Sequence, residues 1–111
     1  MSYKILIVDD EPLIREAIKK KIDGDRTDAL EIYMACDGFE ALEMSRTIYP
    51  DIIITDIKMP EMDGIELIGK IYEMKQTPEC IIISGYSDFE YAKSAIKLGV
   101  KEYMLKPVDA I

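Results

Sequence analysis

Short apolar segments alternate along the chain with segments of helical periodicity, and few folds accommodate this alternation. The apolar segments are rich in isoleucine and mostly lack the every-second-residue pattern of a strand with one face in water. We expect strands at residues 3–8, 30–35, 52–55, 80–84 and 100–105. Strands of this kind that alternate with helices form a parallel sheet covered by helices on both faces. The sequence therefore predicts an α/β domain with a five-stranded parallel sheet.

Helices are expected in the four segments between these strands. The first begins at Pro12, which suits the first turn of a helix, and ends at Gly24. Its buried stripe should consist of isoleucines at helical spacing, namely Ile14, Ile18 and Ile22. The second opens with Asp37 and Glu40 in the pattern of a capping box. The expected ranges of the second, third and fourth helices are 37–48, 65–74 and 87–98.

The carboxyl ends of parallel strands meet at one edge of the sheet, where ligands bind in open α/β folds. Five polar residues stand at these strand ends: Asp9, Asp10, Asp56, Ser84 and Lys106. Asp56 directly follows the third strand and is unsuited to a core, so we expect it to be exposed on this rim. The loop after it contains Pro60 and ends at Asp63-Gly64, an N-cap signal for the third helix.

Three carboxylates in one pocket repel each other, by roughly 4 kcal/mol per pair if they lie about 4 Å apart in an intermediate dielectric. A fold keeps such a cluster when a cation occupies it. Oxygen ligands that are few in number and leave positions open for water suit Mg²⁺, or Mn²⁺, better than a fully caged Ca²⁺. Asp9, Asp10 and Asp56 therefore predict a magnesium site.

Lys106 adds a positive charge to the same rim, and Ser84 adds a hydroxyl group. A carboxylate flanked by a divalent cation, a lysine and a hydroxyl is suited to attack phosphorus, because the two cations neutralise charge on the phosphoryl oxygens. Asp56 would then become an aspartyl phosphate. The chain contains no histidine that could carry the phosphoryl group, so the donor must be another molecule.

Each of these residues also has an ordinary structural interpretation. Asp10 could cap the first helix, Ser84 could be a turn residue and Lys106 could be a solvated charge. For any one residue alone, the ordinary interpretation is the better one. All of them nevertheless fall at strand ends in the order that the chemistry needs, and this combination favours the functional interpretation.

Length, charge and composition exclude several classes of protein. A chain of 111 residues forms one core, so we expect a single domain over residues 1–111. The net charge of −8 argues against direct binding of nucleic acid. The apolar runs are too short to cross a membrane and no signal peptide is evident, so a cytoplasmic location is expected. Cys36 and Cys80 lack metal-ligand spacing and are expected to be reduced and buried.

An ordered set of short motifs resembles the receiver domain of two-component response regulators, and the resemblance covers essentially the whole chain. The motifs are Asp9-Asp10, Asp56 with Met59-Pro60 and Asp63-Gly64, Ser84, and Lys106-Pro107. They are specific as a set and weak singly. The resemblance implies a flavodoxin-like (CheY-like) fold with strand order 2-1-3-4-5. It also implies a signalling switch and not an enzyme. The only chemistry that it implies for the chain is the Mg²⁺-dependent self-phosphorylation and dephosphorylation of Asp56.

The same resemblance implies a role for each site residue. Asp56 would be the phosphoacceptor. The ligands of Mg²⁺ would be Asp10, Asp56 and the main-chain carbonyl of Lys58, together with Asp9, which would act directly or through water. Ser84 and Lys106 would contact the phosphoryl group, and Tyr103 matches an aromatic switch position that responds to Ser84. From the residues alone, Tyr103 would rather be an edge-strand aromatic with its hydroxyl in water.

Partners also follow from the resemblance. The phosphodonor would be a histidine kinase. Segments 84–93, 96–100 and 103–109 are most similar to receivers attached to AraC-type helix-turn-helix output domains. This similarity implies that the chain controls a DNA-binding transcription regulator domain that lies outside it, and it allows a homodimer.

The C-terminus departs from the pattern of the family. Receivers have a fifth helix after the Lys106-Pro107 position, whereas this sequence stops at Ile111. We therefore expect the fifth helix to be truncated or missing. Three explanations stay open: a cut inside the domain, C-terminal residues that are not represented, or a neighbouring chain that covers the gap.

Three other functions compete with the phosphorylated switch. An enzyme with an aspartyl-phosphate intermediate needs a second carboxylate close behind the nucleophile, and Ile57-Lys58 offers none. A flavin carrier on the same fold should prefer neutral or donor-rich phosphate loops over three carboxylates. A pseudo-receiver would only bind partners, and Mg²⁺ binding distinguishes it from a true receiver.

Overall fold

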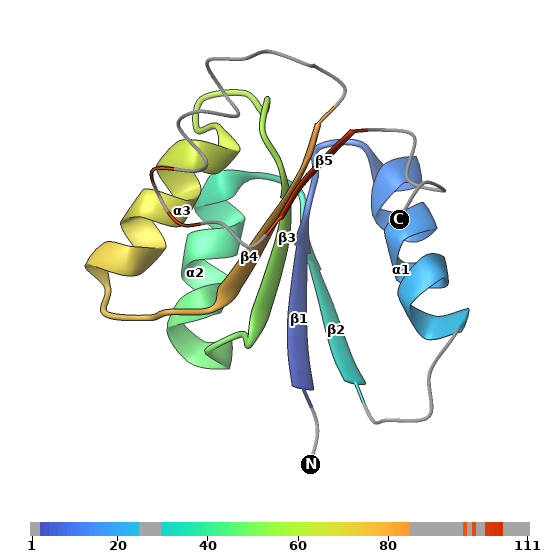
Figure 1. Ribbon diagram of the computed structural model, residues 1–111, viewed down its shortest axis with the longest axis horizontal. Coiled ribbons are helices and arrows are strands. Elements are labelled where there is room, and N and C mark those ends of the chain that lie inside the picture. The colour runs from blue at the N-terminus through green and yellow to red at the C-terminus, as the bar shows by residue number, and fades with distance from the viewer. Residues whose placement is uncertain (1–2, 25–29, 85–96, 98, 100–101, 106–111) are drawn as a thin grey trace.

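The computed structural model describes residues 3–24, 30–84, 97, 99 and 102–105. Within these residues the chain forms a five-stranded sheet in the order β2-β1-β3-β4-β5, in which all neighbouring strands are parallel (Figure 1). The strands are β1 (Tyr3–Val8), β2 (Leu30–Ala35), β3 (Ile52–Asp56), β4 (Glu79–Ser84) and β5 (Glu102–Leu105). The helices are α1 (Pro12–Gly24), α2 (Gly38–Ile48) and α3 (Gly64–Glu73). The predicted α/β fold and its strand order are confirmed.

Helices cover the two faces of the sheet unequally. Helix α1 lies on one face, and α2 and α3 lie side by side on the other (Figure 1). Successive residues of β1 point to opposite faces, so Ile7 packs in the cluster on the α1 side and Leu6 in the cluster under α2 and α3. Both residues are fully buried. Burial on both faces is the reason that the central residues of β1, β3 and β4 are mostly apolar.

Side-chain caps define where α2 and α3 begin. The Asp37 side chain accepts a hydrogen bond from the backbone N–H of Glu40 at 2.8 Å, and the Glu40 carboxylate accepts the N–H of Cys36 at 2.7 Å. Asp63 accepts the N–H of Glu66 at 2.8 Å in the same way. These side chains satisfy amide groups that have no partner within a helix. Both caps predicted from the sequence are confirmed.

The prediction that both cysteines are buried is wrong for one of them. Cys80 in β4 is buried, but Cys36 is exposed. Strand β2 ends at Ala35, so Cys36 lies in the turn that leads into α2 instead of in the strand. There an interaction of the thiol itself with the Glu40 carboxylate, chiefly a side-chain hydrogen bond, raises the pKa of Cys36.

Several predictions concern segments outside the described residues. These are the fourth helix at 87–98, apart from Lys97, and the expectation that the fifth helix after Lys106 is truncated or missing. Among the helices that the structure does describe, none is long and apolar enough to cross a membrane.

Candidate functional site

The structure brings three carboxylates together at one edge of the sheet. Asp9 and Asp10 follow β1, and Asp56 ends β3, which is the neighbouring strand. One carboxylate oxygen from each residue lies within 4.8 Å of the other two. These oxygens are hard, negatively charged donors, so the cluster has the chemistry of a divalent cation site.

The three carboxylates differ in burial. Asp9 is 1% exposed and Asp56 is 6% exposed, whereas Asp10 is exposed. The prediction that Asp56 is exposed on the rim is therefore wrong. The loop after β3 folds over the strand end and buries Ile57 and Met59 beside it. A carboxylate in such surroundings interacts more strongly with a nearby cation than one in bulk water does.

Backbone amide groups orient the two buried carboxylates. Oδ1 of Asp9 accepts the N–H of Glu11 at 2.9 Å, and Oδ1 of Asp56 accepts the N–H of Ile57 at 2.8 Å. These hydrogen bonds fix how the two side chains are turned toward the cluster.

Arg15 supports the acidic strand end, a role that the sequence interpretation missed. It lies one turn into α1, and its guanidinium donates to the carbonyl oxygen of Asp9 at 2.7 Å. This hydrogen bond holds the backbone between β1 and α1 and brings a positive charge close to the carboxylates. A basic residue one helical turn after an acidic strand end is the signal that could have revealed it.

The main chain of Asp56 is held from two sides. The hydroxyl of Thr55 donates to the Asp56 carbonyl oxygen at 2.8 Å. On the other side the start of α3 comes so close that a Cβ atom on Gly64 would collide with this same oxygen. The N–H of Gly64 donates to the carbonyl of Ile57 at 2.8 Å, which fixes this close approach. The backbone of Asp56, the candidate acceptor, is thus held between the Thr55 hydroxyl and the start of α3.

The remaining predicted site residues are placed only in part. Ser84 ends β4 and follows Ile83, which pairs with Asp56, so the backbones of Ser84 and Asp56 lie at the same edge. Tyr103 lies in β5 in register with Ile82. The side chains of Ser84 and Tyr103, and the whole of Lys106, lie outside the described part of the chain. Lys58 is exposed in the loop after Asp56.

Comparison with known proteins identifies the family. The response regulator receiver domain family matches residues 5–111. The transcriptional regulatory protein YesN of Bacillus subtilis is 46% identical over 107 residues, which cover 96% of this chain and 29% of that protein. The transcriptional regulatory protein HptR of Staphylococcus aureus is 42% identical over 109 residues, which cover 96% of this chain and 42% of that protein. The chain thus spans less than half the length of both relatives.

A solved structure shows the same fold. The response regulator TrrA from Thermotoga maritima, crystallised in complex with Mg²⁺-BeF, is 34% identical and gives a TM-score of 0.81. The match covers 96% of this chain and 89% of that chain. Receiver domains of this kind are signalling domains and not enzymes. Both the family match and the CheY-like architecture lead to one assignment: the chain belongs to the response regulator receiver domain family.

Proposed function

We propose that this receiver is a phosphorylation-dependent switch and that Asp56 accepts the phosphoryl group from a histidine kinase. The observation that carries the proposal is the cluster of three carboxylates around the end of β3. A carboxylate oxygen of Asp56 attacks the phosphorus atom and forms an O–P bond, while the bond from phosphorus to the donor imidazole nitrogen breaks. The nitrogen keeps the electron pair, and the product is an aspartyl phosphate.

Mg²⁺ is the cation that we assign to the cluster, with Mn²⁺ as a substitute. Asp9, Asp10 and Asp56 would hold it together with the main-chain carbonyl of Lys58. Oxygens on opposite sides of Mg²⁺ lie about 4.2 Å apart, close to the 4.8 Å limit within which the three carboxylates meet. Three carboxylates leave places for water, which Mg²⁺ retains, whereas Ca²⁺ prefers six to eight protein and water oxygens. When bound, the cation neutralises charge on the phosphoryl oxygens.

Ser84 and Lys106 complete the proposed site. Ser84 would donate its hydroxyl to the phosphoryl group, and Lys106 would pair with the phosphoryl charge. Support comes from the register of the sheet, because Asp56 pairs with Ile83 and Ser84 pairs with Leu105, the residue before Lys106. Tyr103 would follow Ser84 inward and change the surface near β5. Phosphorylation would act by favouring a state that the unphosphorylated domain already samples.

We assign the control of transcription as the output of the switch. Relatives named as transcriptional regulatory proteins are more than twice as long as this chain, which leaves room in them for an output domain. We assign an AraC-type DNA-binding output domain to this receiver, on the similarity of segments 84–93, 96–100 and 103–109. Phosphorylation-dependent DNA binding by the full-length cytoplasmic protein would test this assignment, and its dependence on protein concentration would test whether a homodimer is formed.

Mg²⁺ is expected to raise the thermal unfolding midpoint of the domain, because the cluster exists only in the folded state. A tenfold excess of Mg²⁺ over its Kd contributes about 1.4 kcal/mol, which is a shift of about 5 °C for a domain of this size. Differential scanning calorimetry at increasing Mg²⁺ concentration measures the shift. Asp10→Asn should lose most of this shift in the unfolding midpoint, because it removes one of the three carboxylates of the cluster. Asp10 is exposed, so the substitution leaves the core intact.

The matched control is Asp51→Asn, the same substitution in an exposed aspartate at the other end of β3. This variant should keep the full shift. No shift in the wild type at millimolar Mg²⁺ would indicate a pseudo-receiver. An equal shift in Asp10→Asn would place the bound cation elsewhere.

A further inference from the structure

A hydroxyl group is buried in the strand that ends at Asp56. Thr55 in β3 is 1% exposed, and its partners in the neighbouring strands are the fully buried apolar residues Val8 and Ile82. Valine has nearly the same shape as threonine, is equally suited to a strand and carries no polar group that must leave water. Packing in the core therefore does not explain the hydroxyl group, and its role lies in the hydrogen bond that it makes.

The hydroxyl group of Thr55 donates to the carbonyl oxygen of Asp56 at 2.8 Å. This oxygen belongs to the peptide unit that joins Asp56 to Ile57. The N–H group of the same peptide unit donates to Oδ1 of Asp56, also at 2.8 Å. A peptide unit is planar, so its C=O and N–H groups rotate together. The Thr55 hydroxyl is thus connected to the Asp56 carboxylate through one rigid group and two hydrogen bonds.

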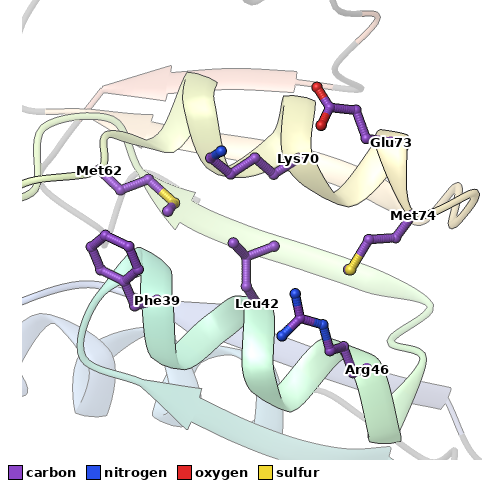
Figure 2. Close-up of a pocket in the computed structure, with 7 residues that line it drawn as sticks. All are labelled: Phe39, Leu42, Arg46, Met62, Lys70, Glu73 and Met74. Carbon is purple, nitrogen blue, oxygen red and sulfur yellow. The ribbon is translucent and has the colours of Figure 1, made fainter.

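The chain beyond this peptide unit is anchored independently. Ile57 is fully buried, and its carbonyl oxygen accepts the N–H of Gly64 at 2.8 Å. Farther along the loop, the Met62 side chain lies between α2 and α3 and is 3% exposed (Figure 2). Rotation of the Asp56–Ile57 peptide plane about the line between its two Cα atoms would leave these anchors in place. This rotation therefore needs a restraint of its own, and the Thr55 hydroxyl supplies one.

From this geometry we infer that Thr55 is a positioning residue, whose hydroxyl orients the Asp56 carboxylate for Mg²⁺ and for attack on phosphorus. Thr55 acts through the peptide unit and not by contact with the cation. The inference rests on the proposed function of Asp56 and adds the residue that directs its oxygen atoms. A carboxylate that is free to turn binds a cation more weakly, because groups that orient metal ligands contribute to the affinity of the site.

Two substitutions at Thr55 separate orientation from packing. Thr55→Val keeps the shape of the side chain and removes the hydroxyl, so the thermal unfolding midpoint without Mg²⁺ should fall by at most about 3 °C. Its Kd for Mg²⁺ should nevertheless rise about tenfold, as is usual when a group that orients a metal ligand is removed. Thr55→Ser keeps the hydroxyl and removes a buried methyl group. It should lower the midpoint by about 5 °C but keep Kd within about threefold of the wild-type value.

Hydrogen exchange of the Ile57 amide follows the proposed connection directly. The bond to the Asp56 carboxylate protects this amide from exchange. In the absence of Mg²⁺, Thr55→Val should exchange it about tenfold faster than the wild type does, whereas Thr55→Ser should not. NMR spectroscopy measures the exchange, and a Mg²⁺ titration of the same amide resonances gives Kd.

Thr47→Val is the matched control, because it makes the same substitution at another hydroxyl that donates to a backbone carbonyl. Thr47 is exposed in α2, and its hydroxyl donates to the carbonyl oxygen of Met44 at 3.2 Å. Both Kd and the exchange rate of the Ile57 amide should stay within about twofold of the wild-type values in this variant.

Two results would overturn the inference. One is a Thr55→Val variant with the wild-type Kd or with wild-type exchange of the Ile57 amide. The other is a Kd that rises in Thr55→Ser as much as in Thr55→Val, because the side chain would then act through packing alone. A wild-type domain that bound no Mg²⁺ would contradict the proposed function instead. Exchange of the Ile57 amide, measured without the cation, would still decide whether Thr55 orients Asp56.

Discussion

Asp56→Asn is expected to abolish acceptance of a phosphoryl group from acetyl phosphate in the presence of Mg²⁺. The wild-type domain should gain one phosphoryl group, which hydroxylamine removes, as measured by intact-protein mass spectrometry. The asparagine amide is a poor nucleophile and lacks the charge that attracts the cation. Asp51→Asn is the matched control, because Asp51 precedes the same strand and its carboxylate accepts the backbone N–H of Lys4 at 2.8 Å. This control should be phosphorylated normally.

The stability of Asp56→Asn shows whether a loss of phosphorylation reflects unfolding. Without Mg²⁺, the substitution removes one of the three carboxylates that lie within 4.8 Å of each other. The relief of repulsion should raise the free energy of unfolding by about 1 kcal/mol, a value reduced by the exposure of Asp10. Hydroxylamine-sensitive phosphate on the Asn variant would disprove the assignment of Asp56. A wild-type domain that binds Mg²⁺ but accepts no phosphate would be a metal-binding domain without the proposed switch.

The meeting of the carboxylates could be predicted because strand order and direction determine it. Asp9 and Asp10 follow β1 and Asp56 ends β3, so adjacent parallel strands must bring these residues to one edge. Local patterns were equally informative at Asp37 and Asp63, where an aspartate followed three residues later by a glutamate marks a helix start. Chain direction and short-range hydrogen bonds can be read from the residues, whereas the strand order that makes β1 and β3 neighbours was implied by the resemblance to receiver domains.

Features that depend on how a loop packs could not be predicted. The burial of Asp56 results from the path of residues 57–63, which turn back over the strand end. Glu61 has a positive φ of 67° within this path, and the N–H of Met62 donates to the carbonyl of Pro60 at 2.7 Å. The hydrogen bond from Arg15 to the Asp9 carbonyl likewise requires the angle between α1 and β1 to be known. The position of Arg15 one turn after the acidic strand end marks it as a candidate partner, but no residue pattern specifies either geometry.

Gly64→Ala is expected to destabilise the domain strongly, although alanine favours helices. A Cβ atom at this position would collide with the carbonyl oxygen of Asp56 and would lie 3.2 Å from its carbonyl carbon and from Cα of Ile57. All of these atoms belong to the backbone of the strand end, so no side-chain rotation relieves the contact. Separating α3 from β3 should cost about 2–3 kcal/mol of unfolding free energy. Urea denaturation measures this loss.

Gly69→Ala is the matched control, because it makes the same substitution in the same helix. A Cβ atom at Gly69 would meet no atom within 4 Å, so only the gain in helix propensity remains. This variant should be about 0.5–1 kcal/mol more stable than the wild type. The free energies of unfolding of the two variants should thus differ from the wild-type value in opposite directions. Equal urea midpoints would show that α3 does not press on the Asp56 carbonyl. The same collision would shift the Asp56 backbone, whose carbonyl also accepts the Thr55 hydroxyl, and would therefore move the Asp56 carboxylate. Gly64→Ala should for this reason weaken Mg²⁺ binding as well, whereas Gly69→Ala should leave Mg²⁺ binding unchanged.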